Sequence, residues 1–176
     1  MYYLDSHAIF SPDRQYRYKL SRTWDYDEPK AAFIMLNPSV ADESINDPTV
    51  SRCVRYAMDW GYGTLIVGNL FAIISTKPQE IWKNEIGHDP IGPENDRYIR
   101  EINREADLII VAWGNHGVYN NRGNALRSWK NPRPSTKPGN GWLSLPRRPG
   151  SRAYQWWMRH SPNPLRAPYS ISLFLF

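Results

Sequence analysis

Three short runs of apolar residues recur along the chain, and each run ends in polar or aromatic residues. The runs cover residues 31–36, 65–68 and 108–112, and they are followed by Asn37-Pro38-Ser39, Asn69-Leu70-Phe71 and Trp113-Gly114-Asn115-His116. Continuous apolar runs of this length indicate strands that are buried on both faces of a sheet. Open α/β folds bind ligands at the carboxyl ends of parallel strands. If the three strands are neighbours and parallel, we therefore expect their ends to form one pocket.

The segments around these runs predict a hairpin and several helices. Residues 7–10 and 16–20 flank a Ser-Pro-Asp-Arg turn, which predicts an N-terminal β-hairpin. Asp47 followed by a proline is typical of a helix start, and the apolar positions after it fall on one helical face. Cys53 lies on that face, so we expect it in the core. Further helices are expected at about residues 75–86, 94–105 and 118–129.

This alternation of strands and helices predicts an α/β fold. We expect residues 1–126 to form a single three-layer α/β/α domain around a central, mostly parallel sheet. Residues 127–176 differ from that domain because they are basic, rich in Pro, Arg and Trp, and without a sustained hydrophobic period. We expect this tail to be poorly ordered or atypical, with one further strand at residues 170–176.

The composition of the chain is ordinary for a soluble protein. The hydrophobic fraction is 41%, and no apolar run approaches the roughly 18 residues of a membrane helix, so we expect no membrane partner. The N-terminus lacks the basic start and apolar stretch of a secretory signal, and a single cysteine cannot form an internal disulfide. We therefore expect the protein in the cytoplasm.

Charge is divided unevenly along the chain. The net charge is +5, yet all 17 acidic residues lie within residues 1–121, whereas residues 122–176 are basic and hold no acid. A basic, aromatic segment can contact phosphates and stack on bases. Such a segment is also typical of a solvated, loosely ordered arm. Both interpretations of the tail remain open.

Short blocks of polar residues and glycines stand at the ends of the predicted elements. They are Met35-Leu36-Asn37-Pro38-Ser39 with Ala41-Asp42, Asp47-Pro48-Thr49 followed by Arg52-Cys53, Trp60-Gly61-Tyr62-Gly63, Gly68-Asn69-Leu70-Phe71-Ala72, Asp89-Pro90-Ile91-Gly92-Pro93-Glu94-Asn95-Asp96 and Ala112-Trp113-Gly114-Asn115-His116-Gly117. In this order, over about residues 7–126, they resemble an uncharacterised bacterial and phage family, domain of unknown function 1643. The resemblance implies no activity. Members usually close with a Gly-rich turn and a His-Pro-Leu segment. The tail departs from that ending, and a shifted reading frame after residue 126 would account for the departure.

The order of the strand-end residues also resembles that of the uracil-DNA glycosylase superfamily. This resemblance implies that Asn37 positions the attacking water and that Asn69 reads the edge of the base. The block from Trp113 to His116 is similar to a mainly structural block of those enzymes. Their final motif supplies a histidine that stabilises the departing base, and residues 160–165 resemble that motif superficially.

Three residues are candidates for catalysis: Asn37, Asp42 and His116. An amide can hold a water but is a poor general base, so hydrolysis requires a carboxylate nearby. Asp42 lies in a loop without an obvious capping task, so it is a base, a metal-associated group or simply exposed. Asp47 is better explained as a helix cap. His116 either acts on a ligand at the rim of the pocket or makes a hydrogen bond at a helix start.

The candidates for substrate binding are Pro38, Ser39, Asn69, Phe71 and Trp113. A buried amide without partners costs about 1–3 kcal/mol, so Asn69 either bonds a neighbouring loop or waits for a ligand. Phe71 either stacks on a flat ligand or packs in the core. One cysteine and four scattered histidines give no zinc spacing, and the chain has no dinucleotide or phosphate loop. We therefore expect no metal and no cofactor.

These residues together predict a domain that handles nucleobases or nucleotides, with nucleic acid or a nucleotide as its partner. If it is an enzyme, it is a hydrolase of glycosidic bonds, and on duplex DNA it must extrude its target base. The alternative is a non-catalytic module of the same fold that binds nucleic acid or protein. A third interpretation is a scaffold in which every motif is structural.

Overall fold

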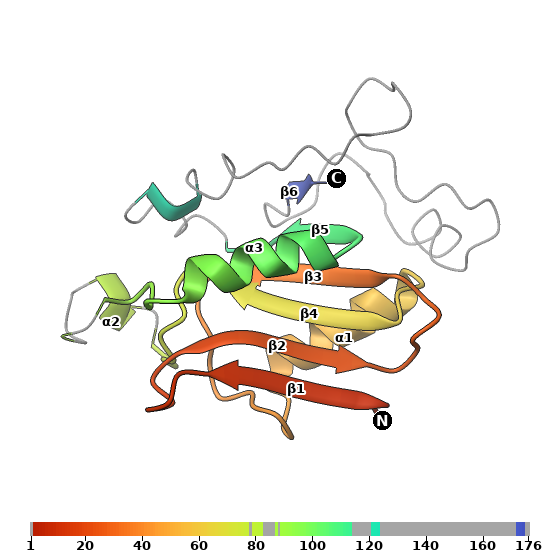
Figure 1. Ribbon diagram of the computed structural model, residues 1–176, viewed down its shortest axis with the longest axis horizontal. Coiled ribbons are helices and arrows are strands. Elements are labelled where there is room, and N and C mark those ends of the chain that lie inside the picture. Colours follow the sequence, from red (N-terminus) through yellow and green to blue (C-terminus); the bar gives the residue numbers. More distant parts are fainter. Residues whose placement is uncertain are drawn as a thin grey trace.

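Strands from both ends of the chain form one six-stranded sheet (Figure 1). The computed structural model describes residues 2–77, 79–82, 87, 89–113, 121–123 and 172–174. The order of the strands in the sheet is β1-β2-β4-β3-β5-β6. They are β1 (Asp5–Phe10), β2 (Arg17–Thr23), β3 (Lys30–Met35), β4 (Thr64–Asn69), β5 (Leu108–Val111) and β6 (Ser172–Phe174).

The first two strands, β1 and β2, form the predicted N-terminal hairpin at one edge of the sheet. They pair antiparallel, with one register shift near Phe10. In the turn, the carboxylate of Asp13 accepts hydrogen bonds from the Ser11 hydroxyl at 2.5 Å and from the Gln15 amide at 3.1 Å. Such side-chain bonds to nearby groups stabilise a reversal of the chain, which explains the turn at this sequence.

The three strands β4, β3 and β5 are neighbours and parallel, which is the arrangement that a shared pocket at their ends requires. β3 lies between the other two, and the register pairs Met35 with Asn69 and Ile34 with Val111. Every residue of β4 is buried, as expected of a strand that is covered on both faces. The carboxyl ends of the three strands therefore meet at one edge of the sheet.

The expectation of a mostly parallel sheet is wrong. Among the described strands, the pairings β1–β2, β2–β4 and β5–β6 are antiparallel, and only β3–β4 and β3–β5 are parallel. The hairpin joins the same sheet beside β4, and β6 pairs antiparallel at the other edge. Hydrophobic periodicity predicts where a strand lies but not the direction of its neighbour, so the α/β class was predictable and the mixed pairing was not.

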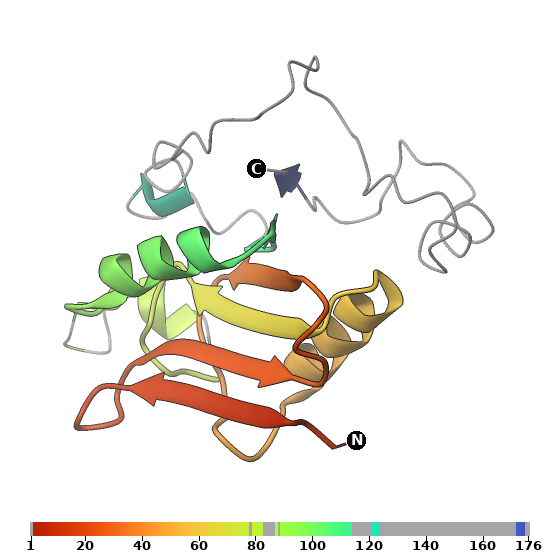
Figure 2. The same cartoon turned by 45° about the vertical axis from the view of Figure 1, so that its right-hand side comes forward.

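Two helices cover opposite faces of the sheet (Figures 1 and 2). Helix α1 (Pro48–Asp59) packs on one face, where its apolar side chains join those of Leu65 and Val67 from β4. Helix α3 (Asn95–Glu105) packs on the other face, where Ile102 joins Ile66. Because side chains alternate along a strand, the odd positions of β4 face α1 and its even positions face α3. Helix α2 (Gln79–Trp82) is a single turn.

The helix boundaries follow the capping signals. The carboxylate of Asp47 accepts a hydrogen bond from the Val50 amide at 2.8 Å, and Pro48 is the first residue of α1. The predicted helix at 94–105 is confirmed as α3. The helix expected at 118–129 lies largely outside the described residues, as does the tail apart from β6, which confirms a strand within residues 170–176.

Candidate functional site

Past their strand ends, the segments after β3 and β4 run side by side. The amide of Leu70 donates to the Met35 carbonyl at 2.8 Å, and the amide of Phe71 donates to the Leu36 carbonyl at 3.0 Å. Further along, the Ser75 amide donates to the Pro38 carbonyl at 3.1 Å. The Asn-Pro-Ser turn therefore lies against the segment that follows Asn69, as the sequence predicts for a shared edge.

The side chain of Asn37 links the segments that follow β3 and β4. Its Nδ2 donates to the Ser75 carbonyl at 2.8 Å and to the Pro38 carbonyl at 3.0 Å. Both amide protons are thus engaged by the main chain. Its Oδ1 makes no hydrogen bond within the described residues, so Asn37 presents an acceptor that can hold a water or a ligand donor.

Asn69 is the most unusual polar residue at this edge. Its side chain is 1% exposed, and neither Nδ2 nor Oδ1 has a hydrogen-bond partner among the described residues. As an odd position of β4 it lies on the α1 side of the sheet, with Leu65 and Val67. An unpaired buried polar group costs about 1–3 kcal/mol of folding free energy. The sequence left two roles open for Asn69, and among the described residues no loop supplies a hydrogen bond to its side chain.

The main-chain carbonyls of Asn69 and Leu70, in contrast, accept hydrogen bonds from side chains. Nδ2 of Asn95 donates to the carbonyls of Asn69 at 3.1 Å and Leu70 at 3.0 Å. The guanidinium of Arg122 donates to the same Leu70 carbonyl from Nε and Nη2, both at 3.2 Å, and Nη2 also contacts Asp96 at 2.6 Å. These bonds fix the end of β4. Sequence reasoning assigned no role to Asn95 or Arg122.

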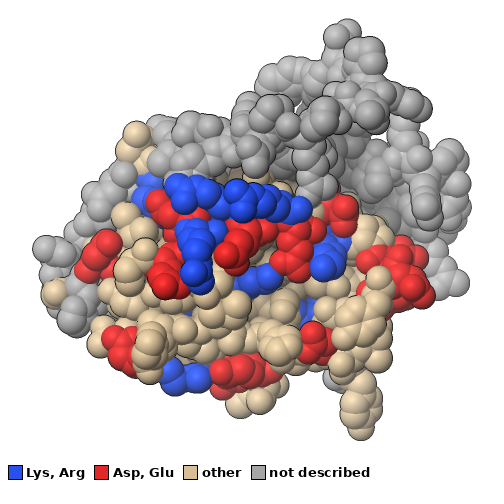
Figure 3. Space-filling view, viewed as in Figure 1, with Lys and Arg blue, Asp and Glu red and all other residues tan. Residues whose placement is uncertain are grey.

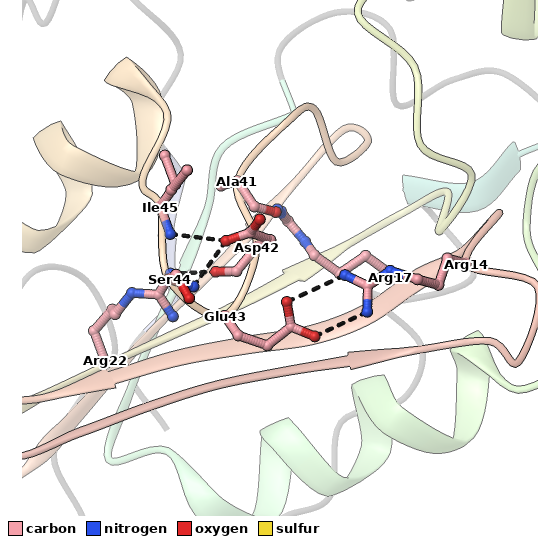
Figure 4. A network of polar contacts seen from close by, with 8 residues as sticks. All are labelled: Arg14, Arg17, Arg22, Ala41, Asp42, Glu43, Ser44 and Ile45. Carbon is pink, nitrogen blue, oxygen red and sulfur yellow. Dashed lines mark hydrogen bonds and ion pairs between the residues drawn. The ribbon is translucent and has the colours of Figure 1, made fainter.

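Two buried arginines of β2 contact the loop that follows the Asn-Pro-Ser turn (Figure 4). Arg17 and Arg22 are each 1% exposed. Nη1 of Arg17 donates to the Ala41 carbonyl, and Nη2 of Arg22 donates to the Asp42 carbonyl. Nε of Arg22 also donates to Oδ1 of Asn46 at 2.9 Å. Two cationic side chains therefore bond the main chain of this loop. Sequence reasoning missed both of them.

A register shift in the hairpin explains why both arginines face this loop. Ile9 lies opposite Lys19, whereas its neighbour Phe10 lies opposite Arg17, so Tyr18 is an additional residue on β2. An additional residue reverses the alternation of side chains on one side of it. Strict alternation would have placed Arg17 on the opposite face from Arg22, so sequence periodicity gave no signal for the pair.

Asp42 lies in this loop, and its carboxylate is turned back into the loop. Its Oδ1 accepts hydrogen bonds from the amides of Ser44 at 2.7 Å and Ile45 at 2.8 Å (Figure 4). These backbone donors lower the pKa of Asp42 below its usual value. A carboxylate with a lowered pKa is a weaker base, so the geometry gives Asp42 a stabilising role in the loop.

The aromatic candidates lie on the other side of the sheet. Phe71 is 0% and Trp113 9% exposed, and both belong to the apolar cluster on the α3 side. Asn69 points to the α1 side, so the strand ends place the amide and the two rings on different faces. His116 lies outside the described residues.

The remaining candidate groups have structural explanations. Asp47 caps α1, and burial raises the pKa of the Cys53 thiol to about 11, which fits a core residue. Within the described residues, no cluster of three or more His, Cys, Asp or Glu side chains could hold a metal ion.

The described surface in Figure 3 carries interleaved positive and negative charges. On α3, for example, Arg97 contacts Glu94 at 3.0 Å and Glu101 at 3.7 Å. Glu105 at the end of the helix pairs with Lys19 and Lys30. Opposed charges of this kind do not make the basic stripe of a nucleic-acid surface. Among the residues described, no helix is long and apolar enough to cross a membrane.

A comparison with known protein families identifies the family of this chain. The family described as "Protein of unknown function (DUF1643)" matches residues 17–140. The chain belongs to this family, as the sequence blocks predicted. No curated protein and no solved structure matches the chain.

Proposed function

We propose that this member of the DUF1643 family is a three-layer α/β/α domain that handles nucleobases or nucleotides at the carboxyl ends of β3 and β4. The observation that carries the proposal is the buried, unpaired amide of Asn69. Its position at the end of a central parallel strand is where open α/β sheets bind ligands.

A nucleobase is the ligand that this amide suits best. A side-chain amide offers a donor and an acceptor in one plane, and the edge of a base offers the complementary pair. Both atoms are removed from water without partners in the described part of the chain, so a ligand that bonds both would offset that cost. The flat ring of a base also suits a site beside buried strands.

The neighbouring turn supplies the second set of contacts in this proposal. Oδ1 of Asn37 and the hydroxyl of Ser39 are the polar groups next to the end of β3, and Pro38 makes the turn rigid. In a glycosidic-bond hydrolase, Asn37 would hold the attacking water and His116 would act on the ligand at the rim of the site. Phe71 and Trp113 would support the site from the α3 side, since both are packed there.

The alternative is a binding module of the same fold without catalysis. The environment of Asp42 favours it, because backbone donors lower the pKa of the carboxyl and a hydrolase needs a base to activate water. Under this alternative the amide of Asn69 still reads a base, and the Asn-Pro-Ser turn orients it without reacting.

The test is a panel of nucleosides, nucleoside monophosphates and short oligonucleotides that contain uracil or modified bases. Binding is measured by calorimetry, and base release by chromatography. We expect at least one member to bind, and Asn69→Leu to abolish that binding. Ser44→Ala, which alters an exposed side chain in the adjacent loop, is the matched control and should bind as the parent does.

Asn37→Ala separates the two forms of the proposal. If base release disappears while binding persists, the protein is a hydrolase. If the parent binds members of the panel and releases no base from any of them, it is a binding module. Binding that is equal in the parent and in Asn69→Leu would overturn the proposal.

A further inference from the structure

The two buried arginines differ in how their hydrogen-bonding groups are used. Arg22 donates from Nε, Nη1 and Nη2, to oxygen atoms of Asn46, Ser21, His7 and Asp42. Arg17 donates from Nη1 to a single carbonyl, that of Ala41, and its Nε is buried with no partner among the described residues. Both arginines therefore bond the loop, but Arg22 uses all three of its nitrogens, whereas Arg17 retains unused donor capacity.

Within the part of the chain that the structure describes, the charge of Arg17 also has no hydrogen-bonded counter-ion. Burial lowers its pKa to about 10, so the guanidinium stays charged at neutral pH. The charges of Asp47 and Asp42 favour the charged form of Arg17 through space, but the hydrogen bonds of the nearby carboxylates go to other donors: Asp42 to backbone amides, Glu43 to Arg14 and Asp47 to the start of α1. A buried charge without a hydrogen-bonded counter-charge is expensive. An anion at this point would remove that cost.

Arg17 and Asn69 lie at the same end of neighbouring strands. The amide of Arg17 donates to the Ala72 carbonyl at 2.9 Å, and Tyr16 bridges to Ile73, so this part of β2 flanks the segment that follows β4. Arg17 reaches Ala41, which packs in the cluster on the α1 side, the side on which Asn69 also lies. Their unpaired donors therefore occur in one buried region of the fold.

We propose that Arg17, next to Asn69, binds an anion and that this anion is the phosphoryl group of a nucleotide. The guanidinium supplies charge-assisted hydrogen bonds, which are stronger than neutral ones and suit phosphate oxygens. The nucleotide part of this inference rests on the proposed function, whereas the anion site rests on Arg17 alone.

The first test needs no variant. The melting temperature of the full chain is measured in sodium phosphate and in sodium chloride at matched ionic strength. A concentration-dependent rise in phosphate alone is expected. Calorimetry then compares a nucleoside with its 5′-monophosphate. We expect the monophosphate to bind at least about tenfold tighter, because one charge-assisted bond contributes roughly that factor or more.

Arg17→Lys keeps a positive charge but lacks the Nε donor and the planar fork of arginine. It should lose most of the preference for the monophosphate and most of the response to phosphate. Arg14→Gln is the matched control, since Arg14 is exposed and pairs with Glu43 at 3.0 Å. It should retain both. If Arg17→Lys does not fold, the comparison of the two ligands on the parent protein still decides the question.

The outcomes separate this inference from the proposed function. Equal affinity for nucleoside and monophosphate, with no effect of phosphate on melting, would overturn the anion site and leave base recognition standing. A phosphate response that depends on Arg17, with no gain from an attached nucleoside, would support the anion site and contradict the proposed nucleobase ligand.

Discussion

Replacement of Asn69 by leucine should make the protein more stable and unable to bind its ligand. Leucine has the branched shape of asparagine without polar atoms. Both polar atoms of Asn69 are buried and have no hydrogen-bond partner among the described residues, and its side chain is 1% exposed. Replacement of an unsatisfied polar group by an apolar one of the same shape removes a desolvation cost of about 1–3 kcal/mol, less any cost of fitting the extra volume.

We therefore expect the free energy of unfolding of Asn69→Leu to rise by about 1–2 kcal/mol. For a chain of this length that corresponds to a melting temperature higher by roughly 2–8 °C. Urea unfolding followed by circular dichroism measures the free energy, and the slope with denaturant should stay unchanged. A gain in stability that accompanies a loss of binding is the usual signature of a functional polar group.

A loss of more than about 1 kcal/mol would refute this reasoning, because it would mean that Asn69 is satisfied inside the folded protein. The companion variant Asn95→Leu shows what such a loss looks like. Asn95 is also fully buried and its Oδ1 has no partner among the described residues, but its Nδ2 donates to two main-chain carbonyls at the end of β4. The opposite signs of the two variants, at two buried asparagines near the same strand end, make a stringent comparison.

Three further predictions follow from the same contacts. Asn95→Leu should lower the free energy of unfolding by about 1–3 kcal/mol in urea unfolding, because it leaves buried carbonyls short of donors; an unchanged value would contradict the assigned role. Asp47→Ala should cost about 1 kcal/mol and fray the start of α1, which faster hydrogen exchange at the Val50 amide would report; protection equal to that of the parent would count against the cap. The folded-state pKa of Asp42 is lowered, so its contribution is complete above the unfolded value of about 4 and is lost as pH falls through the lower folded value. Asp42→Ala should therefore flatten the acid limb of the stability curve, and an unaltered limb would show that the loop bonds do not matter.

The sequence predicted the parallel core of the fold because that core follows from local patterns. The apolar runs at β3, β4 and β5 are too uniform for half-buried strands, and the signals at Asp47 and Pro48 fix the start of α1. The direction of β2 against β4 was not predictable, because it depends on how a hairpin docks onto a sheet and not on the period of its residues.

At the site, the sequence located the strand ends but not the orientation of each side chain. Phe71 and Trp113 each lie two residues beyond the end of a strand, and nothing in the neighbouring sequence shows that both pack on the α3 side. Arg17 was missed because one additional residue in β2 reverses the alternation that a periodic pattern assumes. Arg22 could have been noticed, since it stands two residues after the buried Leu20 in a strand and shares its face.

The most direct measurement of the central claim follows the side-chain amide protons of Asn69 in a nitrogen–proton correlation spectrum. Their resonances are identified as the pair that disappears in Asn69→Leu. During titration with a nucleoside monophosphate that binds the protein, the account predicts that this pair shifts in a saturable manner at the same midpoint as calorimetry. If the ligand saturates the protein while the Asn69 amide protons stay in place, the carboxyl ends of β3 and β4 are not the binding site.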